Sequence, residues 1–123
     1  MSYLDNYKTI DELKGQTLTN IEVGNDEVVF TTKEGKRYRM YHEQDCCELV
    51  TLDRIEGNYS LLMDGTPITV AREEPGHGGS DPDYESVTFT DFVLATSHSG
   101  GVSFHWIGSS NGYYSESVYF IEI

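Results

Sequence analysis

The chain has 123 residues, of which 21 are acidic and eight are basic, and its net charge is −13. This length predicts a single domain, 1–123, with one hydrophobic core. The apolar share of 37% excludes a disordered chain. The negative electrostatic field of such a chain repels nucleic acid and anionic membranes, and it favours a cationic partner.

No stretch has the apolar length of a signal peptide or of a membrane span. We therefore expect a cytoplasmic protein, in which thiols stay reduced. The adjacent Cys46 and Cys47 should then form no disulfide, because the side chains of neighbouring strand residues diverge and the ring would be strained.

The first predicted element is a short helix over residues 7–14. Thr9 is the expected N-cap, and Glu12, three residues later, is its expected capping-box partner. Ile10 and Leu13 lie on the same face of such a helix, so both side chains should pack on a sheet.

Alternating and β-branched stretches predict strands along most of the remaining chain. The expected strands are 18–23, 27–32, 37–43, 49–55, 67–72, 86–96, 102–107, 108–114 and 115–123. The first three, joined by turns at 24–26 and 33–36, should form a meander. In the third strand, Tyr38, Met40 and His42 share one face.

Two segments interrupt this pattern. Residues 58–63 predict a helical turn. Residues 73–84 predict a mobile loop, because they hold three glycines, two prolines and four acids.

The Asn-Gly pair at 111–112 predicts a tight hairpin turn. In that register Trp106 pairs with Ser117, and Phe104 pairs with Tyr119. The sequence as a whole predicts a mostly β domain of the α+β kind, with a bent antiparallel sheet or an open barrel and a short N-terminal helix.

One stretch has the composition of a metal site. His42, Cys46, Cys47 and Asp45 bring an imidazole, two thiols and a carboxylate together within six residues. Zinc prefers such ligands. A third ligand beside His42 and a cysteine would have to come from Asp45, Glu48 or His77. The usual pair of Cys-x2-Cys units is absent, so the alternative is that the cysteines pack as small apolar residues. We expect no cofactor apart from this candidate zinc ion.

A cysteine nucleophile at Cys46 or Cys47 is the enzymatic alternative, and it would need a histidine as its base. Neighbouring carboxylates raise the pKa of a thiol and so disfavour the thiolate. We therefore expect a binding protein and not an enzyme.

Half of the basic residues lie in one predicted hairpin, at Lys33, Lys36, Arg37 and Arg39. Such a positive tip could anchor an acidic group. The alternative, which we prefer, is a charged sheet edge that prevents pairing with other sheets.

A tyrosine- and serine-rich stretch at 108–116 suits adaptable polar contacts with a partner. The alternative is an ordinary hairpin whose tyrosines cover the sheet. The side chains expected to contact a partner are Trp106, Asn111, Tyr113, Tyr114 and Glu116, with Asp81, Asp83 and Glu85 from the acidic segment.

Residues 40–48 read Met-Tyr-His-Glu-Gln-Asp-Cys-Cys-Glu, and residues 110–118 read Ser-Asn-Gly-Tyr-Tyr-Ser-Glu-Ser-Val. In this order and spacing they resemble a family of small proteins of unknown function found in bacteriophages and in prophage-carrying bacterial genomes. The resemblance covers most of the chain and implies no settled activity. It implies a site or core signature formed by His42, Asp45, Cys46, Cys47, Trp106, Asn111, Tyr113, Tyr114 and Glu116.

A phage setting together with the acidic charge suggests a small inhibitor of a host protein that handles nucleic acid. Such a protein would act as an anti-CRISPR or other anti-defence factor and place its carboxylates in a basic groove, as a DNA mimic does. The alternative is a metal- or small-ligand-binding protein, or an enzyme, that uses His42, Cys46 and Cys47.

Overall fold

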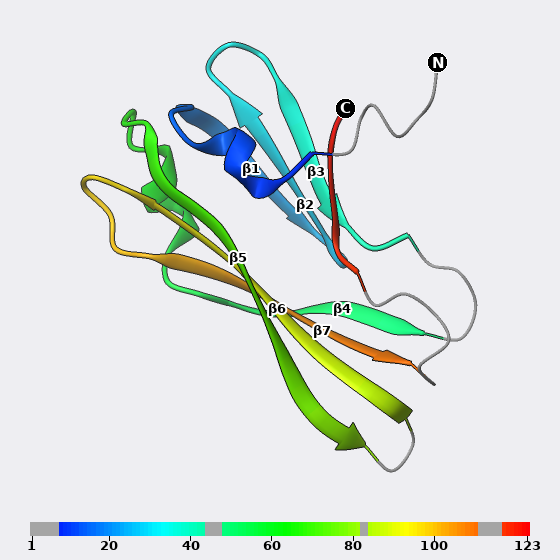
Figure 1. Ribbon diagram of the computed structural model, residues 1–123. Coiled ribbons are helices and arrows are strands. Elements are labelled where there is room, and N and C mark those ends of the chain that lie inside the picture. Colours follow the sequence, from blue (N-terminus) through cyan, green and yellow to red (C-terminus); the bar gives the residue numbers. More distant parts are fainter. Residues whose placement is uncertain (1–7, 44–47, 82–83, 111–116) are drawn as a thin grey trace.

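The computed structural model describes residues 8–43, 48–81, 84–110 and 117–123. For residues 76–81 and 84–86 it describes the backbone alone. Two four-stranded antiparallel sheets pack against each other (Figure 1). The predicted mostly β class is confirmed, and within the described residues neither sheet closes into a barrel.

The first sheet has the order β1-β2-β3-β8, and the second has the order β4-β7-β6-β5. The strands are β1 (Leu18–Gly24), β2 (Glu27–Thr32), β3 (Arg37–Tyr41), β4 (Leu49–Glu56), β5 (Ile68–Asp81), β6 (Tyr84–Thr96), β7 (Val102–Ser110) and β8 (Tyr119–Glu122). Two short 3-10 turns, η2 (Ile10–Leu13) and η3 (Tyr59–Met63), complete the described elements.

The predicted meander is confirmed as β1, β2 and β3, with antiparallel pairing throughout. Its second turn contains Gly35 at a φ of 92°, a conformation that glycine adopts without steric cost. The first turn contains Asp26 at a φ of 54°. Aspartate tolerates this region better than most residues do.

The core lies between the sheets and follows the two-residue period of the strands. In β7, buried and half-buried residues alternate along all nine positions, and Val102, Phe104 and Trp106 are among the buried ones. In β3, Tyr38 and Met40 point inward and are fully buried. The 3-10 turns add three further buried side chains, Ile10, Leu13 and Leu62.

Two contacts join the sheets across this core. The rings of Phe30 in β2 and Phe104 in β7 meet edge to face, with centroids 5.6 Å apart. The indole Nε1 of Trp106 donates a hydrogen bond to Sδ of Met40 at 3.2 Å. Trp106 is 1% exposed, so the structure moves it from the predicted binding surface into the core.

The predicted N-terminal α-helix is replaced by η2, a single 3-10 turn of four residues. The side chain of Thr9 makes no capping hydrogen bond. Lys8 N bonds to Phe120 O and Gly15 N bonds to Ile68 O, so both flanks are held by strands. The remaining span is too short to nucleate an α-helix.

The segment predicted as a mobile loop is largely strand, because β5 continues to Asp81 and pairs with β6. Pro75 is tolerated because β5 is an edge strand with one side free of ladder bonds. Register shifts between His77, Gly79 and Asp81 lie in the glycine-rich part, where bulges are expected. The mobility of 73–84 stays a prediction.

The predicted hairpin is wrong. β7 pairs with β4 on one side and with β6 on the other, so neither of its edges can accept the C-terminal strand. β8 joins the first sheet instead, where Tyr119 stands opposite Tyr41. The pairs Trp106–Ser117 and Phe104–Tyr119 therefore do not form, and the chain changes sheets between residues 110 and 119.

Tyr38 has a hydroxyl that is buried and makes no hydrogen bond within the described structure. Its ring stacks on Phe120, with centroids 5.2 Å apart. Burial raises the pKa of the hydroxyl, and the carboxylates of Glu122, Glu12 and Glu34 raise it further. The hydroxyl therefore loses hydration without gaining a partner.

We predict that Tyr38→Phe leaves the free energy of unfolding unchanged or raises it by about 1 kcal/mol, because the variant buries no unsatisfied hydroxyl. Denaturant unfolding measures the change, and Tyr59→Phe at a half-buried position is the control. A loss of more than about 1 kcal/mol in Tyr38→Phe would show that the hydroxyl has a partner in solution.

Candidate functional site

The first candidate site is built around His42, directly after β3. The alternation that turns Tyr38 and Met40 into the core also turns this imidazole inward, because the three side chains share one face, as the sequence predicts. Its side chain is 3% exposed. An imidazole this deeply buried needs partners for both ring nitrogens.

Both ring nitrogens of His42 have a partner. Nδ1 lies 2.6 Å from the carbonyl oxygen of Ser117. Because a carbonyl can only accept, Nδ1 carries a proton. Nε2 lies 3.2 Å from Oε2 of Glu48, whose side chain is 1% exposed. The ring also stacks against Tyr119 at a centroid distance of 6.1 Å.

We call His42, Glu48 and Ser117 the His42 clamp, because the imidazole ties three strand ends together. His42 follows β3, Glu48 precedes β4, and Ser117 precedes β8. Glu48 and Ser117 belong to different signature stretches, 40–48 and 110–118. The clamp therefore brings the two stretches together at one end of the sandwich.

The other predicted metal ligands, Cys46, Cys47 and Asp45, lie outside the described residues. In the part of the chain that is described, no group of three or more His, Cys, Asp or Glu side chains could hold a metal ion. Metal binding and core packing of the cysteines both stay predictions.

Most of the predicted partner-binding residues also fall outside the described part, namely Asn111, Tyr113, Tyr114, Glu116 and Asp83. Asp81 ends β5 and Glu85 lies in β6, and their side chains are not described. Their role in binding stays a prediction.

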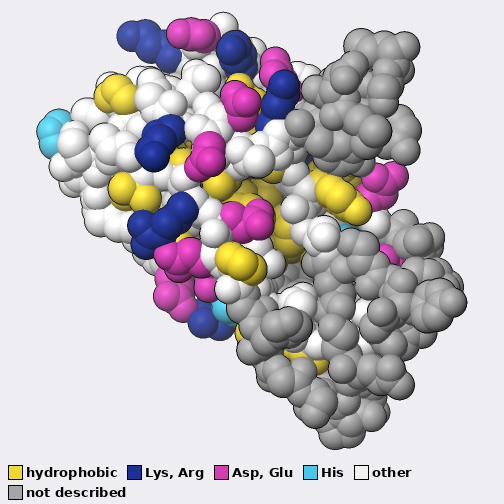
Figure 2. Space-filling model, viewed as in Figure 1, with side chains coloured by type: hydrophobic (Ala, Val, Ile, Leu, Met, Phe, Trp, Pro, Cys, Tyr) yellow, Lys and Arg dark blue, Asp and Glu magenta, His cyan; other side chains and the backbone are white. Residues whose placement is uncertain are grey.

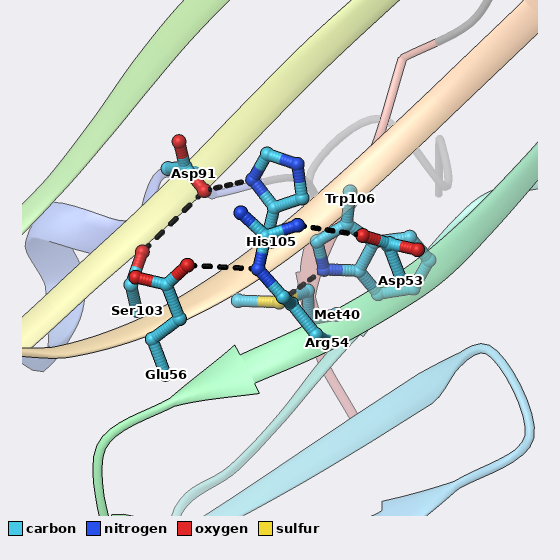
Figure 3. A network of polar contacts seen from close by, with 8 residues as sticks. All are labelled: Met40, Asp53, Arg54, Glu56, Asp91, Ser103, His105 and Trp106. Carbon is cyan, nitrogen blue, oxygen red and sulfur yellow. Dashed lines mark hydrogen bonds and ion pairs between the residues drawn. The ribbon is translucent and has the colours of Figure 1, made fainter.

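A second polar cluster lies on the outer face of the second sheet (Figure 3). Nδ1 of His105 in β7 donates to Oδ1 of Asp91 in β6 at 2.5 Å. Ser103 Oγ donates to the same oxygen at 3.4 Å. Phe89 stacks on the imidazole with a centroid distance of 5.4 Å. The side chain of His105 is 13% exposed.

Ser103, His105 and Asp91 are the residue types of a hydrolase catalytic triad, but their hydrogen bonds do not connect them in the order of a triad. In a triad the histidine lies between the nucleophile and the carboxylate. Here Asp91 lies between Ser103 and His105, so the serine hydroxyl is not bonded to a base. The cluster orients the imidazole and pairs two strands, and it does not activate a nucleophile.

All four arginines of the chain bond to carboxylates on the protein's own surface. The N–O distances are 3.8 Å for Arg37–Glu22, 2.6 Å for Arg39–Glu27, 2.9 and 2.8 Å for Arg54 with Asp53 and Glu56, and 2.5 Å for Arg72–Glu74. On the face drawn in Figure 2, basic side chains accordingly lie next to acidic ones.

In the predicted positive tip, Arg37 and Arg39 are paired with carboxylates. Among the described residues, Lys33 and Lys36 form no ion pair. Both are exposed and flank Glu34. The tip therefore offers little net positive charge for an acidic group.

A shallow hollow of about 340 Å³ lies where η2 meets β5. Thr9, Ile10, Asp11, Arg72 and Glu73 line it. Partial removal from water raises the pKa of the Glu73 carboxyl. The two carboxylates exceed the single guanidinium, which is bonded to Glu74, so this hollow is also acidic.

Sequence reasoning found His42 but not its full surroundings. Glu48 was one of several carboxylates that could accompany His42, and its place directly before a strand is the only local signal. Ser117 and Asp91 are brought in by strand pairing over 75 and 14 residues. A single sequence contains no local signal that predicts such long-range pairings.

A family model described as Domain of unknown function (DUF7448) matches residues 11–120. The chain belongs to this family. The match spans both signature stretches and both sheets, so the His42 clamp lies inside the family's domain. No curated protein and no solved structure matches the chain. Among the described residues, no helix has the length and apolarity needed to cross a membrane.

We predict that His42→Leu lowers the free energy of unfolding by about 3 kcal/mol, because it leaves Glu48 buried without its partner. Urea unfolding followed by Trp106 fluorescence measures the loss. The control is His98→Leu, at a histidine whose side chain is 69% exposed. That variant should change stability by less than about 0.5 kcal/mol. Equal effects of the two variants would contradict a buried clamp.

Proposed function

We propose that this protein inhibits a host protein that handles nucleic acid by binding in its basic groove. Carboxylates of the inhibitor would occupy positions that phosphates of DNA or RNA otherwise take. The phage setting comes from the resemblance of the two signature stretches. In that setting, the natural targets are defence enzymes, which makes an anti-CRISPR or related anti-defence role the specific form of the proposal.

The observation that carries the proposal is the internal pairing of every arginine. The four arginines contact five carboxylates and offset four of the 21 acidic charges, which leaves seventeen acidic charges against four lysines. The positive charge of every arginine is therefore compensated locally, and the outward field is negative. A field of one sign attracts an oppositely charged groove and speeds association with it.

Several of the remaining acids are well placed to meet a partner. Asp11, Glu12 and Asp26 are exposed and form no ion pair among the described contacts. They lie on η2 and on the first turn of the meander. Acids spread over separate turns can follow the spaced phosphates of a nucleic acid, as the proposal requires.

We predict that binding to the host partner weakens roughly 100-fold or more between about 50 and 200 mM salt, because the contacts replace those of several phosphates. The partner is first isolated from a bacterial host by affinity capture and identified. Its affinity is then measured by calorimetry at several salt concentrations, with and without competing DNA. Salt-independent binding that DNA does not compete with would contradict the proposal.

Single charge reversals locate the contact. Asp81→Lys should weaken binding at least about tenfold, because it places a cation against the basic groove. Glu34→Lys, between Lys33 and Lys36, makes the same change in net charge and is the matched control. Cys46→Ser should leave binding unchanged. Equal losses for the two reversals would show a general charge effect and no specific contact.

A second candidate function is binding of a metal or small ligand at His42. The observation that favours it is the burial of an imidazole and a carboxylate side by side, at 3% and 1% exposure. The two functions are compatible, because the clamp is buried whereas the acids of the first proposal are exposed.

A further inference from the structure

We propose that a groove at the free edge of β4 binds an arginine side chain of the partner protein. The groove has a volume of about 410 Å³ and is lined by residues 23–26, at the end of β1 and in the first turn of the meander, and by residues 52–55 of β4. That the arginine belongs to a host protein rests on the proposed function, whereas the chemistry of the groove does not.

Apolar side chains form part of the groove. Val23 shares a strand face with the buried Ile21, but it is 39% exposed, so the second sheet leaves it partly uncovered. Leu52 and Ile55 are half-buried and pack against the core. Such a surface can cover the alkyl stem of a long side chain while the charged end of that side chain stays at the rim.

An irregularity of β4 brings the two apolar residues of that strand to the same face. Leu52 stands opposite Trp106 and Ile55 stands opposite Phe104, and both partners are buried. The β4 strand has one residue more than β7 between these two pairs, so Leu52 and Ile55 face the core although three positions separate them. Bulges of this kind are common at sheet edges and beside functional sites, where they redirect side chains.

Asp26 connects the two sheets at the groove. Its Oδ1 accepts a hydrogen bond from the backbone N–H of Leu52 at 3.0 Å, and this bond holds the first turn of the meander against β4. Among the described contacts, Oδ2 of Asp26 forms no hydrogen bond and no ion pair. This oxygen can therefore accept a hydrogen bond from a cationic ligand.

The charge of the groove selects a cation. Arg54 is the basic residue of the lining, and it is bonded to Asp53 at 2.9 Å and to Glu56 at 2.8 Å (Figure 3). With Asp26, the carboxylates exceed this single guanidinium by two charges. Arginine fits better than lysine, because its guanidinium presents five N–H donors and is more weakly hydrated than an ammonium group. Arginine is also frequent among the residues that dominate protein interfaces.

Titration with small probes, followed by nuclear magnetic resonance of the intact chain, tests the groove. Nα-acetyl-arginine amide is added at a constant ionic strength of about 0.15 M, which screens long-range attraction. We expect the amide signals of Val23 and Leu52 to shift and to saturate. Nα-acetyl-citrulline amide, which lacks the charge, and the guanidinium ion, which lacks the alkyl stem, should each bind at least about threefold more weakly.

A pair of variants tests the same groove from the protein's side. Asp26→Asn removes the charge but keeps a side-chain oxygen that can accept the bond from Leu52. It should weaken binding of the arginine probe at least about threefold, whereas Glu34→Gln, the same charge change on the second turn, should not. Equal binding of either comparison probe, equal effects of the two variants, or signal shifts that omit Leu52 would overturn the proposal.

The source of the arginine is tested separately, with the host protein isolated by affinity capture. Weaker binding of that protein to Asp26→Asn than to Glu34→Gln supports an arginine of the partner in the groove. Equal affinities of the two variants would overturn this assignment. A groove that binds the arginine probe in a chain that captures no nucleic-acid-handling protein would contradict the proposed function and leave the chemistry of the groove confirmed.

Discussion

The apolar faces of the two sheets have to cover each other, because neither sheet has enough buried surface to be stable alone. The edge-to-face contact of Phe30 with Phe104 and the Trp106–Met40 hydrogen bond lie in this shared layer. The chain reaches the arrangement by crossing between sheets twice near the same end, from β3 to β4 and from β7 to β8. The side chains of His42 and Glu48, at the first crossing, are buried and need internal partners. The imidazole of His42 fulfils that need by contacting one group from each crossing.

The buried clamp and the charged outer surface have separate roles, the clamp in stability and the surface in recognition. The side chains of His42 and Glu48 are buried at the strand ends, so their interaction affects chiefly the stability of the folded state. The outer surface carries arginines that are already paired with carboxylates, and a large excess of further acids. Electrostatic recognition by a basic partner needs only this surface. The Asp91–His105 cluster belongs to the surface by position, but its hydrogen bonds serve to pair β6 with β7.

Local patterns predicted much of the fold, because two-residue alternation depends on neighbours in sequence. The meander and the shared face of Tyr38 and Met40 could be predicted this way. The errors arose where position in a sheet overrides local preference. Pro75 is compatible with a strand only because β5 is an edge, and the Asn-Gly turn signal at 111–112 cannot make a hairpin when both edges of β7 are occupied. At the site, His42 could be identified, whereas Ser117 could not, because 75 residues separate the two in sequence.

The central claim is that His42 and Glu48 form one buried unit at the junction of the two signature stretches. A double-mutant cycle tests it most directly, with His42→Leu, Glu48→Leu and the double variant unfolded in denaturant under the same conditions. The account predicts a coupling energy of at least about 1 kcal/mol, since each single variant leaves the other group buried without its partner whereas the double variant does not. Additivity of the two single variants within about 0.3–0.5 kcal/mol would contradict it.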